Sequence, residues 1–358
     1  MSKDKVKNFF KELKNKLIVS TSGMAIGLFG TLIFGTILDL FGKIPNLEII
    51  SSISTVIKGL MGAGIGLGVA LALEKKGVTI VSSMASGMLG TYAYSFSDKA
   101  LSSISDPLSS YVSTIICLLM IKLILRKKTP VDLLLIPIVG IGFSILYTIF
   151  LSRYVHFITI GISELIRISF DVIPIIMCII VSALVGMSLT APISSVAICV
   201  AIQIGNVPLA SMAALVGCAT QMVGFAVESI RDNKIGGTIA IGIGTSMLEF
   251  KNIIRKPVIW LPTIIASVLL SPLSFLLYNY LDLGNLSIQS LSVGAGMGTS
   301  GLVGPINYLD ACNYSIESII FTILFLVIVP GVLVFLIDLI FRKFNIIKDG
   351  DFALSNDI

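Results

Sequence analysis

Two short motifs of the same composition combine free hydroxyl groups with a weakened backbone. They are residues 242–246 (GIGTS) and 296–300 (GMGTS), and they lie in the glycine-rich apolar stretches 235–249 and 291–304. Glycines in series weaken a helix and allow the backbone to approach a ligand closely. Thr and Ser hydroxyls both donate and accept hydrogen bonds, so the motifs are suited to holding a polar solute. The alternative is that the glycines mark close helix packing, as small residues do in membranes.

An acid and two amides lie near these motifs. Glu249 and Asn252 follow the first motif at three-residue intervals, and Gln221 lies inside an apolar run. A carboxylate can accept hydrogen bonds from a polyol, or act as a general base on a hydroxyl that is being phosphorylated. Glu249 has a second interpretation, an interfacial ion pair with Lys251 or Arg255, and both remain open. The candidate solute-binding set is Ser194, Ser195, Gln221, Thr245, Ser246, Glu249, Asn252, Thr299 and Ser300, with Glu249 as the candidate catalytic base.

The composition of the chain indicates the class of protein that carries these groups. Of the 358 residues, 55% are hydrophobic and 13% are charged, whereas soluble chains carry about 25% charged residues. So few charges cannot cover the surface of a soluble enzyme, a disordered chain or a nucleic-acid binder. The five cysteines form no CxxC pair, and no metal or nucleotide motif is present. We therefore predict an all-α polytopic membrane protein without a cofactor or a metal.

Apolar runs of about 20 residues predict the membrane-spanning helices. We count ten: 17–40, 49–73, 78–97, 107–125, 131–151, 172–190, 193–205, 208–228, 257–278 and 318–341. The stretches 235–249 and 291–304 are too short and glycine-rich to cross. Short interrupted segments in paired positions are typical of transporter binding sites, so we predict two re-entrant hairpins that meet near the midplane.

Basic residues test this topology independently. With the N-terminus in the cytoplasm and ten alternating spans, 19 of the 25 Lys and Arg residues fall on the cytoplasmic side and four fall outside. Such a bias is the positive-inside rule. Both termini are therefore predicted to be cytoplasmic, in a multi-pass protein of a bacterial plasma (inner) membrane.

The same map gives the domain organisation. We predict a cytoplasmic amphipathic lead-in (1–16), an N-terminal half of five spans (17–151), an interfacial helical connector (152–171), a C-terminal half that includes both re-entrant segments (172–341), and a cytoplasmic tail (342–358). No hydrophilic stretch is long enough for a phosphocarrier domain in this chain.

Charged residues at span ends or inside spans have structural interpretations. Lys58 lies inside a span and is expected to pair with an acid such as Asp39 or Glu48, or to reach the interface. Glu228 and Arg231 are expected to form an ion pair at a helix end.

Three other features are not expected to form the site. The glycine-rich stretch 62–68 lies in a full-length span and favours helix packing. Asp106 precedes a proline and is expected to cap the next helix. The single histidine, His156, is expected at the surface, with a phospho-acceptor or ligand role as the less favoured alternative.

The chain from about 180 to 305 resembles the EIIC-like membrane proteins of the bacterial phosphotransferase system, in particular the group that includes a perfringolysin O regulator. The matching stretches are 185–198 (VGMSLTAPISSVAI), 216–248 (VGCATQMVGFAVESIRDNKIGGTIAIGIGTSML), 252–267 (NIIRKPVIWLPTIIAS) and 294–306 (GAGMGTSGLVGPI). The resemblance implies a ten-span permease that forms a homodimer and binds a sugar-like solute at the midplane.

In better-studied EIIC proteins a separate EIIB chain phosphorylates the sugar, with a histidine and a glutamate near the hairpins. Glu249 can stand in place of that glutamate, but neither hairpin contains a histidine and the GITEP-type motif is absent. The chain is then at most the membrane subunit of a protein-phosphohistidine–sugar phosphotransferase, and coupling to separate EIIA and EIIB chains is left open. The expected function is a permease for a small polar solute. The alternative is a membrane sensor or regulator that binds a ligand without net transport.

Overall fold

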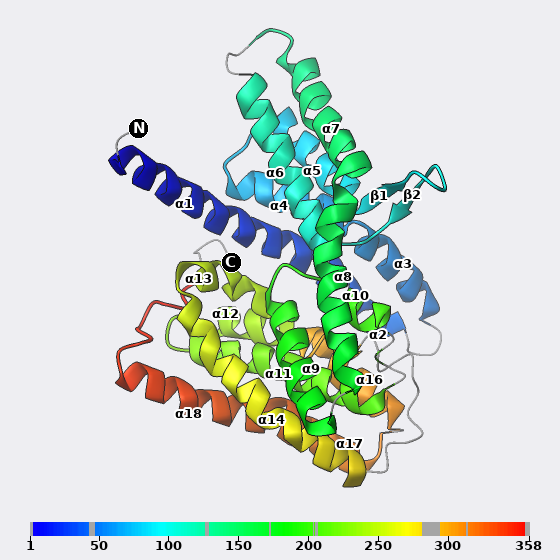
Figure 1. Cartoon of the computed structure of the whole chain (residues 1–358), viewed down its shortest axis with the longest axis vertical. Helices are drawn as coiled ribbons and strands as arrows, with labels where there is room; N and C mark the ends of the chain where they lie inside the picture. Colours follow the sequence, from blue (N-terminus) through cyan, green and yellow to red (C-terminus); the bar gives the residue numbers. More distant parts are fainter. Residues whose placement is uncertain are drawn as a thin grey trace. The chain divides into compact units, whose positions relative to one another are not determined.

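Most of the chain forms apolar helices. The computed structural model describes residues 3–42, 47–125, 129–171, 173–202, 204, 207–280, 294–312 and 314–354. It divides into two units, Met1–Phe157 and Ile158–Ile358 (Figure 1). We describe each unit by itself.

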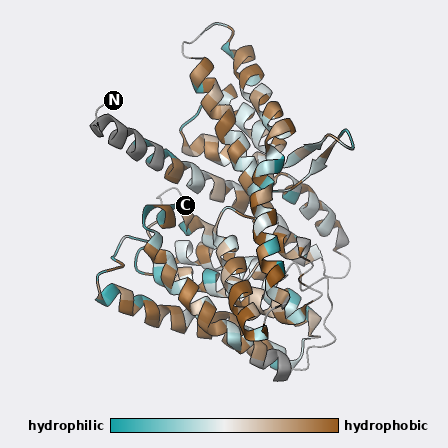
Figure 2. Ribbon diagram, viewed as in Figure 1, coloured by the Kyte–Doolittle hydropathy of each residue, from teal (hydrophilic) through white to brown (hydrophobic). Residues whose placement is uncertain are grey.

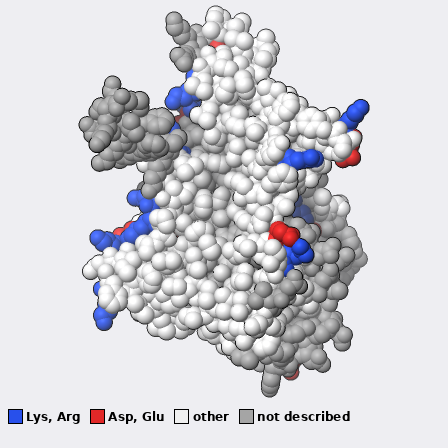
Figure 3. All heavy atoms as spheres, viewed as in Figure 1, with Lys and Arg blue, Asp and Glu red and all other residues white. Residues whose placement is uncertain are grey.

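Within the described residues, six helical segments are long and apolar enough to cross a bilayer. They are Asn15–Asp39, Pro107–Ile124, Asp132–Phe150, Pro208–Ser229, Pro257–Phe275 and Ile316–Lys343. A seventh candidate is the pair Ile49–Gly59 and Met61–Ala72, which is bent by 48°. All seven coincide with predicted spans, and apolar residues dominate α7, α14 and α18 (Figure 2). The face seen in Figure 3 carries few charged side chains. The protein is thus a polytopic helical membrane protein.

The three other predicted spans are shorter in the structure. The run 78–97 becomes helix α5, Val78–Leu89, followed by a hairpin of β1 and β2. The run 172–190 becomes α9, Pro174–Thr190, and the run 193–205 contains α10, Ser195–Ala201. Seven helical residues extend only about 10 Å. A count of ten spans therefore stays a prediction.

The first unit is a helical assembly with one hairpin. Its elements are α1 (Lys3–Leu28), the π-helical turn η1 (Phe29–Ile33), α2 (Phe34–Gly42), α3 (Glu48–Gly59), α4 (Met61–Ala72), α5, β1 (Tyr92–Ser95), β2 (Ala100–Ser103), α6 (Pro107–Ile124), α7 (Asp132–Phe150) and the start of α8 (Ser152–Ile168). Helix α4 packs between α1 and α5, and α5 packs on α6 and α7. A Cβ at Gly66 of α4 would lie 2.1 Å from the Ser83 carbonyl oxygen of α5. This contact supports the packing interpretation of residues 62–68.

Ionisable side chains of the first unit largely have the expected partners. Lys58 Nζ lies 2.9 Å from Asp39 Oδ2, which confirms that pairing. Asp106 caps α6, because its Oδ1 accepts from the Leu108 N–H at 2.9 Å. His156 was expected at the surface, but it is only 23% exposed and its Nδ1 lies 3.1 Å from Asp106 Oδ2. Hydrogen bonding to that cap explains its partial burial.

The second unit contains every candidate site residue. Its elements are η2 (Ser169–Asp171), α9, α10, α11 (Pro208–Ser229), α12 (Ile235–Ile239), η4 (Ala240–Gly244), η5 (Ser246–Glu249), α13 (Phe250–Arg255), η6 (Pro257–Trp260), α14 (Leu261–Tyr280), η8 (Ser300–Leu302), α16 (Val303–Ala311), α17 (Ile316–Ile323), η9 (Leu324–Ile328) and α18 (Val329–Lys343). Prolines begin α9 and α11, where their missing N–H costs nothing.

Helix α11 is the core of this unit. It packs against α9, α14, α18 and η4, and 89% of its most apolar 18-residue stretch is buried inside the protein. Small residues line it from Ala210 to Ala219, which lets the surrounding helices approach closely. The site is built around this helix.

Candidate functional site

The first motif breaks a short apolar helix. Residues Ile235–Gly244 are helical, but ten residues extend about 15 Å, half of a hydrocarbon core of about 30 Å. Thr245 is then extended (φ −160°, ψ 132°), and its hydroxyl accepts from the Met247 N–H at 3.2 Å. The chain restarts as η5, which carries Ser246 and Glu249. The helix is thus interrupted within the motif, and the Thr245 hydroxyl caps the helical turn that follows. That the chain then returns to the side of the membrane from which it entered stays a prediction.

The second motif turns tightly against α11. Gly298 has φ +52°, and a Cβ there would lie 2.5 Å from the backbone carbon of Cys218. Both conditions require glycine at this position. The turn leads through η8 into α16, while residues 291–293 of the predicted segment lie outside the described residues.

The two motifs meet in the structure. Thr299 Oγ1 donates to the Gly242 carbonyl oxygen, and Ser300 Oγ donates to the Gly244 carbonyl oxygen, both at 2.7 Å. Ser195 Oγ, at the start of α10, donates to the Gly296 carbonyl oxygen at 2.6 Å. These hydroxyl protons therefore join the two motifs, and only the oxygen lone pairs remain for a solute.

A second polar group centres on Gln221 of α11. Its Oε1 accepts from Trp260 Nε1 at 2.9 Å, from Thr263 Oγ1 at 3.1 Å and from Thr190 Oγ1 at 3.3 Å. The Thr190 hydroxyl also lies 2.9 Å from Ser246 Oγ. Three donors on one oxygen fix the orientation of the amide. Gln221 Nε2 is buried and has no partner within the described part of the chain.

Glu249 and Asn252 form a buried pair one turn further on. Asn252 Nδ2 donates to Glu249 Oε2 at 2.7 Å, and the two residues are at most 1% exposed. Glu249 Oε1 and Asn252 Oδ1 have no partner among the described residues. Burying an unsatisfied oxygen costs on the order of 1–3 kcal/mol. Glu249 is therefore buried within the protein beside Asn252.

The structure brings most of the predicted set together through η5 and α11. Gln221 and Ser246 share one network, Glu249 and Asn252 form the adjacent pair, and Ser195, Thr299 and Ser300 join the motifs. Ser194 is half-buried and precedes α10. Trp260 and Thr263 were not among the predicted residues. The signal for them was the only tryptophan of the chain, three residues before a threonine, at the start of a helix.

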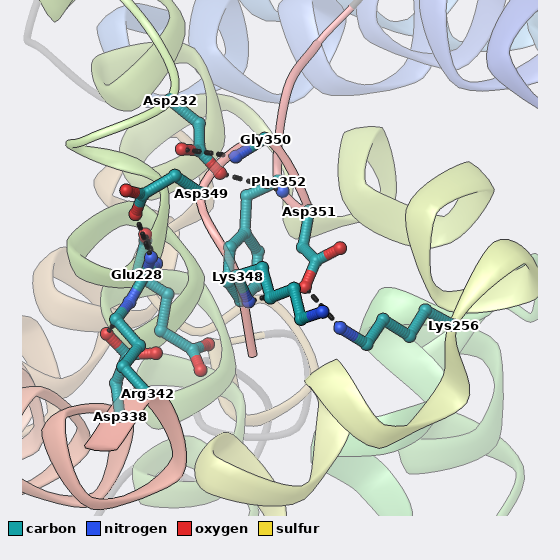
Figure 4. Close-up of polar contacts among 10 residues, drawn as sticks. All are labelled: Glu228, Asp232, Lys256, Asp338, Arg342, Lys348, Asp349, Gly350, Asp351 and Phe352. Atoms are coloured by element: carbon teal, nitrogen blue, oxygen red, sulfur yellow. Dashed lines mark hydrogen bonds and ion pairs between the residues drawn. The ribbon is translucent and has the colours of Figure 1, made fainter. Parts of the chain in front are cut away.

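The expected ion pair between Glu228 and Arg231 is not found. Glu228 is 1% exposed, and neither of its carboxylate oxygens has a hydrogen-bond partner among the described residues. Arg342 of α18 donates to the Glu228 backbone carbonyl at 3.2 Å and to Asp338 Oδ2 at 2.6 Å (Figure 4). The prediction is wrong because the Glu228 side chain is buried rather than exposed at the helix end.

These helices and this buried polar site define a multi-pass membrane protein with a candidate solute site in one unit. The family model described as phosphotransferase system, EIIC matches residues 18–354, nearly the whole chain. The chain therefore belongs to the EIIC family, whose members are sugar permease domains. No curated protein and no solved structure matches it.

Proposed function

We propose that this EIIC protein binds a small polar, sugar-like solute in the second unit and moves it across a bacterial plasma membrane. The observation that carries the proposal is a set of three buried polar atoms without partners among the described residues: Gln221 Nε2, Glu249 Oε1 and Asn252 Oδ1. Each sugar hydroxyl donates one hydrogen bond and accepts others. The several hydroxyls of one sugar can therefore satisfy a free amide donor and two free oxygens, which an apolar or purely anionic ligand cannot do.

The surrounding groups fit the same solute. The indole of Trp260 is half-buried beside Gln221, and aromatic faces offer sugars an apolar surface with a polar edge. The lone pairs of Thr245, Ser246, Thr299 and Ser300 add acceptors at the joined motifs. Alternating access would move one gate region against another around these groups. A homodimer with both termini in the cytoplasm completes the proposal.

Coupling to phosphorylation is the finer part of the proposal. With a separate EIIB chain as phosphoryl donor, the solute hydroxyl oxygen would bond to phosphorus while the bond between phosphorus and the EIIB residue breaks and leaves that residue free, and Glu249 Oε1 would accept the hydroxyl proton. The single histidine of the chain belongs to the first unit and bonds to Asp106. Glu249 is therefore the residue on which this chemistry rests.

A binding titration tests the proposal. Trp260 is the only tryptophan, so the intrinsic fluorescence of the purified protein reports on the site directly. Sugars and sugar phosphates are titrated one by one, and a ligand also raises the unfolding temperature. We expect a saturable change with at least one of them. No response to any member of the panel would contradict the proposal.

Two variants localise the binding. Gln221→Glu keeps an oxygen for Trp260 and Thr263 but removes the free N–H donors, so we expect at least about a tenfold loss of affinity. Thr220→Val is the matched control, because Thr220 is equally buried on α11 and bonds only to the Val216 carbonyl of its own helix. Equal effects of the two variants would place the binding elsewhere.

A transport assay distinguishes the permease from the alternative, a membrane regulator. A permease in proteoliposomes accumulates or exchanges the labelled ligand, whereas a sensor binds it without uptake. The predicted cytoplasmic loop 229–256 offers a basic surface for a partner. Binding without uptake, together with loss of regulation after charge reversal at Lys234, would favour the sensor.

A further inference from the structure

The segment after α18 folds back onto the second unit. Asn345 adopts a positive φ of +56°, and the Ile346 N–H donates to the Phe341 carbonyl at 2.9 Å. These are features of a helix end that turns the chain sharply. The following residues, Lys348–Leu354, run across the turn after α11, and we call them the tail segment.

Two consecutive residues of that turn hold the backbone of the tail segment. Asp232 accepts from the Gly350 N–H at 2.8 Å and from the Phe352 N–H at 3.0 Å (Figure 4). Asn233 donates to the Phe352 carbonyl at 2.8 Å and accepts from the Leu354 N–H at 2.9 Å. Alternate residues of the tail segment, which turns at Gly350 (φ +88°), are thus bound through their main chain.

Side chains of the tail segment add two anchors. Phe352 is completely buried, with its ring centroid 6.4 Å from that of Phe225 on α11 and the Arg342 guanidinium 5.8 Å above it. Asp351 Oδ2 lies 2.5 Å from Lys256 Nζ, on the other flank (Figure 4). A buried aromatic ring and a flanking ion pair make this a docked segment.

The docked segment touches the candidate site itself. Asn252 Nδ2, which donates to Glu249 Oε2, also lies 3.3 Å from the Ala353 carbonyl oxygen and donates to it. Leu354 reaches α12, since its Cδ1 would lie 3.4 Å from a Cβ at Gly237. Phe225, under the Phe352 ring, is one helical turn from Gln221. The tail segment therefore contacts the three elements α11, α12 and α13 that flank the site.

We propose that the tail segment is a displaceable plug that closes the site on its predicted cytoplasmic side and shares Asn252 with the solute. The proposal rests on the proposed function, because it assigns Glu249 and Asn252 to the solute. The Ala353 carbonyl uses Nδ2 of the Asn252 amide, and the solute would use its Oδ1, so a solute that draws this amide toward itself lengthens the 3.3 Å bond to Ala353. Filling the site then loosens the plug, and release to the cytoplasm requires the plug to leave.

The first test measures the docking without any solute. Amide hydrogen exchange of the purified full-length protein should show Gly350, Phe352 and Leu354 protected. Asp232→Ala removes the acceptor of two of these N–H groups, so their exchange should accelerate at least about tenfold. Asp349→Ala is the control, because the Asp349 side chain is 83% exposed and pairs only with Arg342 among the described residues. Exchange as fast as in an unstructured peptide in the unaltered protein would overturn the plug, whatever the solute.

The second test measures access to the site. A Ser246→Cys chain in inverted membrane vesicles is labelled with a membrane-impermeant maleimide, against the background of the same chain with Ser246. Labelling should be at least about tenfold faster with Phe352→Ala or Asp232→Ala. It should be unchanged with Phe344→Ala, because Phe344 is 69% exposed. Equal rates in all chains would overturn the plug and leave the proposed solute site standing, whereas faster labelling without any ligand response would support the plug and contradict the solute site.

Discussion

Small residues have different roles in the two units. In the first unit, glycines and serines bring helices together, and Ser110 and Ser113 bond to the Gly87 and Ser86 carbonyl oxygens of α5. The buried side-chain atoms without partners there are the hydroxyls of Ser82 and Ser86, among the described residues. In the second unit such atoms include amides and carboxylates.

We interpret this difference as that between a scaffold and the proposed solute site. An unsatisfied buried hydroxyl or amide costs on the order of 1–3 kcal/mol, whereas a buried carboxylate without partners costs more. The second unit keeps several of them on and around α11, its most buried helix. Such a cost is retained where the missing partner is a ligand, and the predictions below test that contrast.

The largest expected effect is on folding of the first unit. Gly66→Ala places a Cβ 2.1 Å from the Ser83 carbonyl oxygen, so α4 and α5 must separate. We expect the free energy of unfolding to fall by about 1–3 kcal/mol or more, despite the better helix propensity of alanine. The measurement is thermal unfolding, monitored as the loss of the folded protein's peak in size-exclusion chromatography. Gly59→Ala is the control, because a Cβ at that position would have no other atom within 4 Å.

If the first unit acts only as a scaffold, the Gly66→Ala protein that remains folded should bind the solute with unchanged affinity. A loss of affinity at unchanged fold would show that the first unit also contributes to the site.

The second prediction concerns the buried carboxylate of the second unit. Glu249→Gln keeps an oxygen for Asn252 but replaces the free acceptor Oε1 with an amide donor, so we expect affinity for the solute to fall by about 10- to 100-fold. The same change should leave the unfolding temperature nearly unchanged, because one buried polar atom without a partner replaces another. Fluorescence titration and thermal unfolding give the two values, with Glu317→Gln as the exposed control. Loss of both affinity and stability would make Glu249 a structural residue.

The third prediction compares equivalent hydrogen bonds in the two units. Thr299→Val removes the bond to Gly242, and Ser110→Ala removes the bond to Gly87. Each should lower the free energy of unfolding by about 1 kcal/mol. Only Thr299→Val should also weaken binding, since it loosens the joined motifs. Equal affinities in both variants would confine the motifs to a packing role, the alternative stated for them from sequence.

Hydropathy predicted much of this fold, because long apolar runs have few other structures. It did not distinguish α5 plus a hairpin from one long span over 78–97, since Tyr92–Ser95 contains no charged residue that would end an apolar run. The two motifs were predicted to meet from their paired composition, and they do. By contrast, contacts such as Trp260 with Gln221 or Phe352 with Phe225 join residues 39 and 127 positions apart, and no local pattern marks them. Tertiary packing decides which polar residue of an apolar run remains without a partner.

The smallest expected effect is a pH dependence of the plug. Burial tends to raise the pKa of Asp351, but hydrogen bonds from Lys256 Nζ and the Lys348 N–H, with the Lys256 and Arg342 charges, hold it below its usual 3.8. A folded-state pKa below the unfolded one means that the carboxylate stabilises docking above that usual value and that this contribution is lost as pH falls below about 4. We measure protection of the Gly350 and Phe352 amides, relative to an unstructured peptide at each pH, in the unaltered protein and in Asp351→Asn. The advantage of the unaltered protein should be present at pH 6 and should shrink as the pH falls below about 4. No advantage at pH 6 would mean that Asp232, Asn233 and the Phe352 ring hold the tail segment without the Lys256 pair.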